Sequence, residues 1–207
     1  MKLADEEFIR PEGCFEEARQ NKELTRKRIL ADLKKLSATA RANKSKQIRK
    51  HLVEHQDVTD AGTILMFASL PTEPDIDPLL DEPELGHVTF CYPRMERKNL
   101  AIYVVTSVDH LVVTKGHLRE PDPKKCERLE VDDLDMVLIP GLAFASRSGG
   151  RLGRGGGYYD RLLAEEYLRA QSIGVCFQSQ IKDTLPLEPH DELVDGMVTE
   201  TGLTMMH

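Results

Sequence analysis

Residues 135–160 read DMVLIPGLAFASRSGGRLGRGGGYYD and pass from an apolar run through a glycine-rich loop into helix-forming sequence. The first part, 135–144, is the most apolar strand-like run of the chain, and strands covered on both faces have this composition. Further strand-like runs lie at 62–71, 87–95, 100–107, 172–179 and 196–200. Helical patterns lie between several of them, so we predict an α/β fold with a mostly parallel sheet and helices on its faces.

Length and composition favour one globular domain. The 207 residues are 40% hydrophobic and 30% charged, which is ordinary for a globular protein with a substantial core. The one candidate linker, 119–133, is too short and too charged to separate a second core. We therefore predict an acidic, poorly ordered extension over 1–19 and a single α/β domain over 20–207.

Other features exclude several classes of protein. No run reaches the roughly 18 apolar residues of a membrane-spanning helix, and the start of the chain lacks the layout of a signal peptide. We therefore expect a cytoplasmic protein. The net charge of −7 argues against a nucleic-acid binder. Four scattered cysteines indicate buried, reduced thiols rather than a zinc site or a disulfide framework: Cys14, Cys91, Cys126 and Cys176.

A basic segment precedes the first strand-like run. Residues 20–50 contain eleven Lys or Arg and two acids, and the apolar residues from 21 to 56 predict two helices separated around 37–43. Such a basic run is usually a solvated helix face, but it can also present cations to a polyphosphate. HLVEH, residues 51–55, has the form of an inverted zinc protease motif, so a metalloprotease is one alternative.

The glycine-rich loop has two explanations. Seven of the fourteen glycines lie between 141 and 157, and glycine lets backbone amides approach a ligand closely. A flexible surface loop would explain the glycine count alone. Arg151, Arg154 and the abrupt start of a helix, predicted over 158–171, favour a phosphate-binding loop instead. The spacing matches neither the P-loop nor the dinucleotide fingerprint.

Three sets of carboxylates are candidate ligands. Asp160 lies in the first turn of the predicted helix, where the helix dipole stabilises it, and Mg²⁺ usually takes one or two carboxylates plus substrate phosphates. The second carboxylate would come from Asp191 or Asp195. Glu73 lies in SLPTEPD, which is either a rigid turn or a support that lets this carboxylate bind donor groups of a heterocycle.

The stretch PGLAFASRSGGRLGRGGGYYDRLL resembles the signature of the 5-formyltetrahydrofolate cyclo-ligase family, also called methenyltetrahydrofolate synthetases. Weaker likeness covers KELTR, FASLPTEPDID, YPR, REP and PHDELVDGMVTE. The resemblance implies a three-layer α/β/α, Rossmann-like fold. It also implies an ATP- and Mg²⁺-dependent cyclisation of 5-formyltetrahydrofolate to 5,10-methenyltetrahydrofolate, with release of ADP and phosphate. The alternative is a nucleotide-binding regulatory protein of the same fold without folate turnover.

The resemblance also implies roles for residues at matching positions. Asp160 and Asp191 would hold Mg²⁺, and Tyr158 and Arg154 would act in catalysis. Glu73, Arg154 and Tyr158 would contact the folate. The implied ATP-binding residues are Lys22, Arg26, Arg151, Gly153, Arg154, Gly155, Gly156, Gly157 and Tyr158.

Two departures from the family pattern concern the substrates. Some members have a lysine where this chain has Gly156, and some carry a Trp that helps cover the folate, whereas this chain has no Trp. We expect His117 or Leu118 to cover part of the pterin. We also expect a monomer that acts on small-molecule substrates and has no nucleic-acid or membrane partner.

Overall fold

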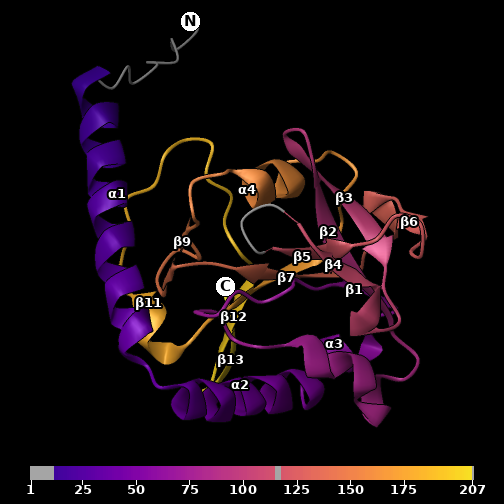
Figure 1. Ribbon diagram of the computed structural model, residues 1–207. Coiled ribbons are helices and arrows are strands. Elements are labelled where there is room, and N and C mark those ends of the chain that lie inside the picture. Colours follow the sequence, from indigo (N-terminus) through magenta and orange to yellow (C-terminus); the bar gives the residue numbers. More distant parts are fainter. Residues whose placement is uncertain (1–11, 115–117, 207) are drawn as a thin grey trace, which may run out of the picture.

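The computed structural model of the protein describes residues 12–114 and 118–206, and Figure 1 shows how its elements are arranged. The described helices are α1 (Glu12–Lys35), α2 (Ala38–Val53), α3 (Gln56–Asp60) and α4 (Tyr158–Leu163). Short 3-10 helices cover Asp77–Asp81, Pro83–Leu85, Val108–His110, Val131–Asp133 and Gln178–Gln180.

The described strands form one large sheet and two small ones. The large sheet has the order β13 (Gly202–Met205), β12 (Gly196–Thr199), β10 (Gln171–Val175), β7 (Met136–Pro140), β1 (Thr63–Leu65), β2 (Thr89–Glu96), β3 (Asn99–Val104), β6 (Arg128–Leu129). The five strands from β12 to β2 are parallel, and β13 and β3 pair antiparallel to them at the two sides. The predicted α/β class with a largely parallel sheet is confirmed.

Both faces of the central strands are buried. In β7, Met136 and Leu138 belong to one hydrophobic cluster, while Val137 and Ile139 belong to a second one. Successive side chains of a strand point to opposite faces, so β7 contributes to both clusters. This is why the run 135–144 is apolar at almost every position instead of alternating.

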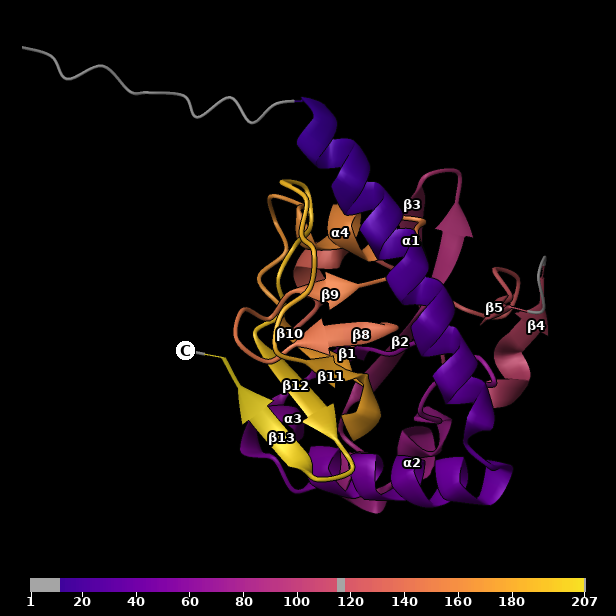
Figure 2. The same ribbon diagram turned by 90° about the vertical axis from the view of Figure 1, so that its left-hand side faces the viewer.

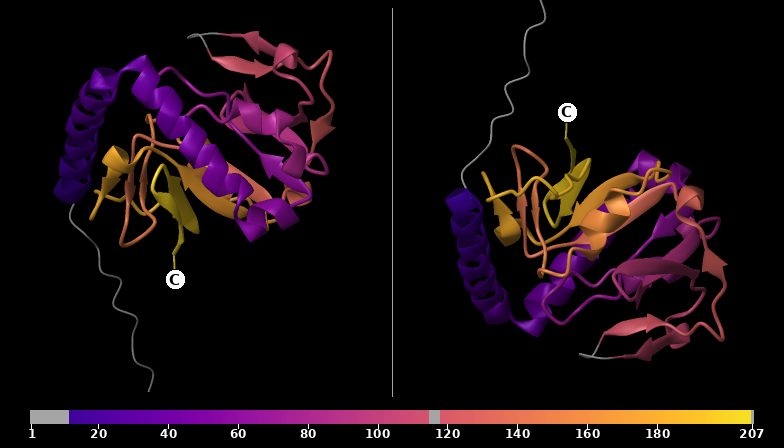
Figure 3. Two further views of the ribbon diagram at one scale, coloured as in Figure 1. Left: turned by 90° about the horizontal axis from the view of Figure 1, so that it is seen from below. Right: turned by 90° about the horizontal axis from the view of Figure 1, so that it is seen from above.

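Helices lie on both sides of the large sheet. In Figure 3, α2 crosses the sheet in the view from below and α4 lies over it in the view from above. Ile48 and Leu52 of α2 are fully buried in one cluster, and Leu162 of α4 is buried in the other. Figures 1 and 2 both show α1 alongside the small sheet made by β8, β9 and β11.

The two predicted N-terminal helices are present, but the break between them is shorter than expected. α1 ends at Lys35, and the side chain of Ser37 caps α2 by accepting a hydrogen bond from the amide of Ala40. The helix N-terminus prefers such a hydroxyl, so the chain resumes helix at once. α1 also takes in residues 12–19 of the predicted extension, whose residues 1–11 lie outside the described part of the chain.

The helix predicted over 158–171 was too long, because α4 ends at Leu163. Tighter turns follow, in which Glu165 donates to the carbonyl of Leu162 and Leu168 donates to that of Glu165. β10 (Gln171–Val175) then begins one residue before the predicted run 172–179 and ends four residues before the end of that run. The continuous run 135–144 is likewise divided, since β7 ends at Pro140 and β8 (Ala143–Ala145) joins a different sheet.

The shortest strands had no clear sequence signal. They are β6 (Arg128–Leu129) at the edge of the large sheet, β9 (Arg151–Leu152) and β11 (Ile181–Lys182), which pair with β8, and the hairpin of β4 (Leu111–Val113) and β5 (Arg119–Pro121). Strands of two or three residues are too short to show an alternating pattern. Among the helices described, none has both the length and the apolar composition that crossing a bilayer requires.

The cysteines in the described side chains are free and buried, as predicted: Cys91, Cys126 and Cys176. Burial raises the pKa of Cys91 to about 12 and raises the pKa of the other two thiols as well. These groups therefore stay protonated at neutral pH.

Candidate active site

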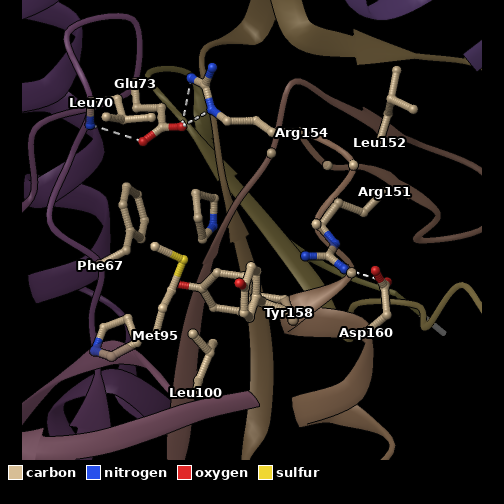
Figure 4. Close-up of a pocket in the computed structure, with 18 of the residues that line it drawn as sticks. Phe67, Leu70, Glu73, Met95, Leu100, Arg151, Leu152, Arg154, Tyr158 and Asp160 are labelled. Carbon is tan, nitrogen blue, oxygen red and sulfur yellow. Dashed lines mark hydrogen bonds and ion pairs between the residues drawn. The ribbon is translucent and has the colours of Figure 1, made fainter. Parts of the chain in front are cut away.

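A cavity of about 790 Å³ opens beyond the carboxyl ends of β1 and β7. Parallel sheets gather their ligand-binding loops at this edge. The cavity is bounded by α1, by the loop after β1, by β5, by the glycine-rich loop with α4, and by a loop around residues 188–191. Figure 4 shows that charged residues line one part of it and that apolar residues line another.

The glycine-rich loop has a defined shape. β9 pairs antiparallel with β8, and the chain then turns through Gly153–Gly157 to start α4. Gly155 and Gly157 adopt positive φ angles of 101° and 64°, which side chains other than glycine rarely adopt. α4 has only six residues, so its dipole is small and the loop backbone and arginines must supply most of any attraction for anions.

Lys22 on α1 forms the first ion pair of the cavity. Its ammonium group donates to Asp191 and, at 2.8 Å, to Glu188, although its own side chain is only 4% exposed. The hydrogen bond from Lys22 lowers the pKa of Glu188. Four residues further along the helix, Arg26 donates from Nε to the carbonyl of Gly153 at 2.9 Å. α1 is thus attached to two walls of the cavity.

Arg151 and Asp160 form the second ion pair. Nη2 of Arg151 donates to Oδ1 of Asp160 at 2.5 Å, and the guanidinium lies 5.7 Å from the ring centroid of Tyr159. The Arg151 side chain is 3% exposed, and its buried Nε has no hydrogen-bond partner among the described residues. Oδ1 of Asp160 also accepts from the amide of Glu192 at 3.4 Å, which brings Asp160 to the segment that carries Asp191.

Arg154 and Glu73 form the third ion pair, between the glycine-rich loop and the loop after β1 (Figure 4). Nε of Arg154 donates to Oε1 of Glu73 at 2.9 Å, and its Nη2 donates to Thr72 at 3.1 Å. Oε2 of Glu73 accepts from the amide of Leu70 at 3.0 Å, so the carboxylate is held from both sides. The turn of SLPTEPD therefore fixes Glu73 at the cavity. A rigid turn and a support for a ligand-binding carboxylate, the two interpretations of this segment, are compatible with each other.

The apolar part of the cavity surrounds Tyr158. Figure 4 shows Phe67, Met95 and Leu100 gathered near its ring. The Tyr158 hydroxyl donates to the carbonyl of Arg97 at 3.4 Å, in the turn between β2 and β3. Burial raises the pKa of the neighbouring Tyr159, and the charge of Glu73 raises it further.

Every site residue named from the resemblance lines this one cavity. These residues come from positions 22 to 191 of the chain, so the fold brings together what the sequence separates widely. Leu118 also lines the cavity, whereas His117 lies outside the described residues. Asp195, the other candidate for a second carboxylate, accepts hydrogen bonds from the backbone and hydroxyl of Ser172 instead.

Sequence reasoning missed several lining residues. Phe67, Met95 and Leu100 lie in ordinary strand-like runs, and an apolar residue facing a cavity looks the same in sequence as one facing the core. His190 lies beside Asp191 in the matched segment PHDELVDGMVTE, and Glu188 lies just before that segment, which was a usable signal. The three offer ligand atoms within 4.8 Å of one another.

The geometry assumed for a zinc protease at HLVEH is wrong. α2 ends at Val53, so His55 lies beyond the helix and does not share a face with His51. His51 lies 3.4 Å from the carbonyl of Glu200. Among the described residues, neither histidine belongs to a group of three potential metal ligands.

Comparisons with known proteins identify the family of the chain. The model of the 5-formyltetrahydrofolate cyclo-ligase family matches residues 18–200. The chain is 26% identical to the mitochondrial 5-formyltetrahydrofolate cyclo-ligase of Arabidopsis thaliana, over 89% of this chain and 76% of that protein. It is 27% identical to the 5-formyltetrahydrofolate cyclo-ligase of Mus musculus, over 81% and 88% of the two chains.

A solved structure shows the same fold. The NMR structure of Aquifex aeolicus 5,10-methenyltetrahydrofolate synthetase superimposes with a TM-score of 0.78 at 29% identity, covering 90% of this chain and 93% of that one. The family match extends over nearly all of the described structure and includes every wall of the cavity. The chain therefore belongs to the 5-formyltetrahydrofolate cyclo-ligase family.

Proposed function

We propose that this protein cyclises 5-formyltetrahydrofolate to 5,10-methenyltetrahydrofolate and converts ATP to ADP and phosphate. The observation that carries this proposal is one cavity with two chemically different parts. The charged part, with Lys22, Arg26 and the arginines of the glycine-rich loop, suits a triphosphate. The apolar part, with Glu73 beside it, suits a planar heterocycle with hydrogen-bond donors.

The proposed ATP site uses the backbone of Gly153–Gly157 and the cations around it. Three of these cations are paired with carboxylates of the same cavity: Lys22 with Glu188 and Asp191, Arg151 with Asp160, and Arg154 with Glu73. In these ion pairs the charges of the cations and of the carboxylates balance one another. A bound triphosphate supplies new partners for the cations and thus releases carboxylate oxygens.

The released carboxylates are suited to Mg²⁺. Asp160 and Asp191 offer hard oxygen ligands from two segments in contact, which fits a cation that takes one or two carboxylates plus phosphates. His190 is less suitable, because its nitrogen is a softer ligand. We propose that Asp160 and Asp191 hold Mg²⁺, which would neutralise negative charge on the phosphates of ATP.

The chemistry requires positioning more than a reactive side chain. The formyl oxygen attacks the γ-phosphorus of ATP and displaces ADP, nitrogen 10 then attacks the activated formyl carbon, and loss of phosphate leaves the methenyl bridge. In this scheme Glu73 orients the pterin, and Tyr158 faces the formyl group. Arg154 moves from Glu73 to the transferred phosphate. Holding the two substrates in line accounts for much of the rate enhancement in such reactions.

The remaining proposals concern the whole protein. We infer a three-layer α/β/α, Rossmann-like architecture in which residues 20–207 form a single domain. The two hydrophobic clusters, one on each face of the sheet, support this arrangement. We further propose that the protein works as a monomer in the cytoplasm, on small-molecule substrates, without a nucleic-acid or membrane partner.

A direct test mixes the protein with MgATP and 5-formyltetrahydrofolate and follows the absorbance of the methenyl product. We expect product only when all three components are present, and one ADP per product. Arg28→Ala is a suitable control, since Arg28 is exposed on α1 and lies outside the cavity lining. ATP binding without any product would instead favour a nucleotide-binding regulatory protein.

A further inference from the structure

Arg161 is an exposed residue of α4 that joins three parts of the structure. Its Nε donates to the carbonyl of Lys98 at 2.7 Å, and its Nη2 donates to the carbonyl of Gly156 at 3.0 Å. Its guanidinium carbon lies 5.1 Å from the centroid of the Tyr158 ring. A Cβ placed on Gly157 would lie 2.8 Å from Nη1, so the guanidinium is packed directly against the loop.

These contacts are unusual for an exposed arginine. Ordering a long, flexible side chain costs conformational entropy, and this cost must be offset by charge-assisted hydrogen bonds and a cation–π contact. Arg161 does not itself line the cavity. Any effect on the reaction must therefore act through the residues that Arg161 contacts.

Tyr158 is enclosed on several sides by this arrangement. Arg161 lies against its ring, and its hydroxyl donates to the carbonyl of Arg97. A Cβ on Gly156 would lie 2.8 Å from Cδ2 of the ring, so the ring occupies the space that a side chain at 156 would need. The orientation of the ring therefore depends on both residues.

We infer that Arg161 is a positioning residue that holds Tyr158 and the Gly156–Gly157 segment against the turn between β2 and β3. This inference rests on the proposed function, because Tyr158 is the residue proposed to face the formyl group. The fork of the guanidinium is essential, since it reaches carbonyls on two different segments. A lysine can donate to only one of them with the same geometry.

The first experiment measures the position of the Tyr158 ring without using activity. Tyrosine ring carbons are labelled for NMR, and the Tyr158 signal is assigned with Tyr158→Phe. We expect Arg161→Ala to shift this signal, and Gly156→Ala to shift it as well, because a Cβ at 156 would collide with the ring. Arg169→Ala is the matched control, because Arg169 is exposed and its hydrogen bonds within the described part of the chain go only to the nearby carbonyls of Glu166 and Leu168.

The second experiment compares the effect of Arg161→Ala on the two substrates. We expect Arg161→Ala to lower kcat/KM for 5-formyltetrahydrofolate about tenfold, as for one lost charge-assisted hydrogen bond, with KM for ATP changed less than about twofold. Arg161 holds only the Gly156–Gly157 part of the proposed ATP site. The ATP contacts proposed for Lys22, Arg26 and Arg151 do not depend on it, so the effect on ATP should be the smaller one. Arg161→Lys should recover part of the loss because it keeps the charge near the ring.

Two outcomes overturn the inference. One is an unshifted Tyr158 signal in Arg161→Ala. The other is an equal loss for both substrates with a lower melting temperature and no recovery in Arg161→Lys, which indicates a general structural role. If Arg161→Ala does not fold, the Tyr158 signal and the kinetic constants for both substrates are measured on Arg161→Lys and Arg161→Gln instead. If the wild-type protein makes no product, the proposed function fails while the NMR result still decides whether Arg161 positions Tyr158.

Discussion

The carboxylate of Asp160 accepts a 2.5 Å hydrogen bond from Arg151, whose side chain is 3% exposed. Asp160→Ala leaves this buried guanidinium without its carboxylate, so we expect it to lower the free energy of unfolding by about 3 kcal/mol. Asp160→Asn keeps an acceptor oxygen and should cost less stability. Both variants should lose Mg²⁺-dependent turnover.

Denaturant unfolding and product formation distinguish these two roles of Asp160. If Asp160→Ala is as stable as the wild type, the ion pair with Arg151 is not stabilising. If Asp160→Asn keeps full turnover, Asp160 is not the metal ligand. Because the asparagine variant stays folded, its loss of turnover can be assigned to the site.

The glycines of the loop differ in what they contribute. Gly149 has a φ of 71°, and a Cβ there would lie 2.5 Å from the carbonyl oxygen of Val194, so Gly149→Ala should lower the free energy of unfolding. We expect a loss of about 2 to 3 kcal/mol. Gly153 has nothing within 4 Å of its Cβ position, and Gly153→Ala should stay within about 0.5 kcal/mol of wild type.

The comparison of Gly149→Ala with Gly153→Ala tests whether the loop has a defined backbone conformation or is flexible. Gly153 lines the cavity, so Gly153→Ala should weaken ATP binding while the fold stays intact. Chemical denaturation together with calorimetric titration of ATP measures both effects. Equal stability of the two variants would mean that the loop tolerates side chains and is flexible.

At the scale of elements, α1 is attached to the 188–191 loop through Lys22. The hydrogen bond from Lys22 lowers the pKa of Glu188 from its ordinary value of 4.5, so the folded state favours the ionised carboxylate. This stabilisation is present above about pH 4.5 and is lost as the pH falls through the folded-state pKa. Lys22→Met should therefore be less stable than wild type, by about 2 to 4 kcal/mol at pH 7.

The difference in unfolding free energy between wild type and Lys22→Met should shrink as the pH is lowered below 4.5. Lys27→Met is the matched control, because Lys27 forms an exposed pair with Glu23 on the same helix. Exposed pairs contribute little, so this control should stay close to wild type. A difference that is independent of pH would show that Lys22 stabilises α1 by packing alone.

α1 also contacts the glycine-rich loop, through Arg26 and the carbonyl of Gly153. We expect Arg26→Ala to weaken ATP binding by about 1 to 3 kcal/mol, as for one charge-assisted hydrogen bond. Arg28→Ala, two residues along the same helix and exposed, should leave it unchanged. Calorimetric titration of ATP measures both affinities. If Arg26→Ala and Arg28→Ala bind ATP equally well, α1 does not contribute to the ATP site through Arg26.

The elements also show what the sequence can predict. The apolar run 135–144 identified the strand that leads into the glycine-rich loop, because a strand buried on both faces needs apolar residues throughout. The end of α4 was not predictable from the pattern after Leu163, since the turns at Glu165 and Leu168 are stabilised by local hydrogen bonds.

At the scale of the whole molecule, local motifs identified the charged part of the cavity better than the apolar part. Glycines, arginines and Asp160 are adjacent in sequence, so their common position was predictable. The pairing of Lys22 with Glu188, 166 residues away, depends on how α1 lies against the sheet. Phe67, Met95 and Leu100 carried no signal, because their exposure to the cavity is a property of the tertiary structure.

The cavity is built from segments between Lys22 and Asp191, so ligand binding should stabilise the entire fold. MgATP at about 100 times its Kd should add about 2.7 kcal/mol and raise the melting temperature by roughly 5 to 10 °C. ATP with EDTA should give a smaller rise. In Asp160→Asn the two rises should differ less than in the wild type, because one of the two proposed magnesium ligands is missing while Lys22, Arg26 and the loop backbone remain. Equal rises in the wild type would instead show that ATP binds without the metal, and the carboxylates would then serve only as partners of the buried cations.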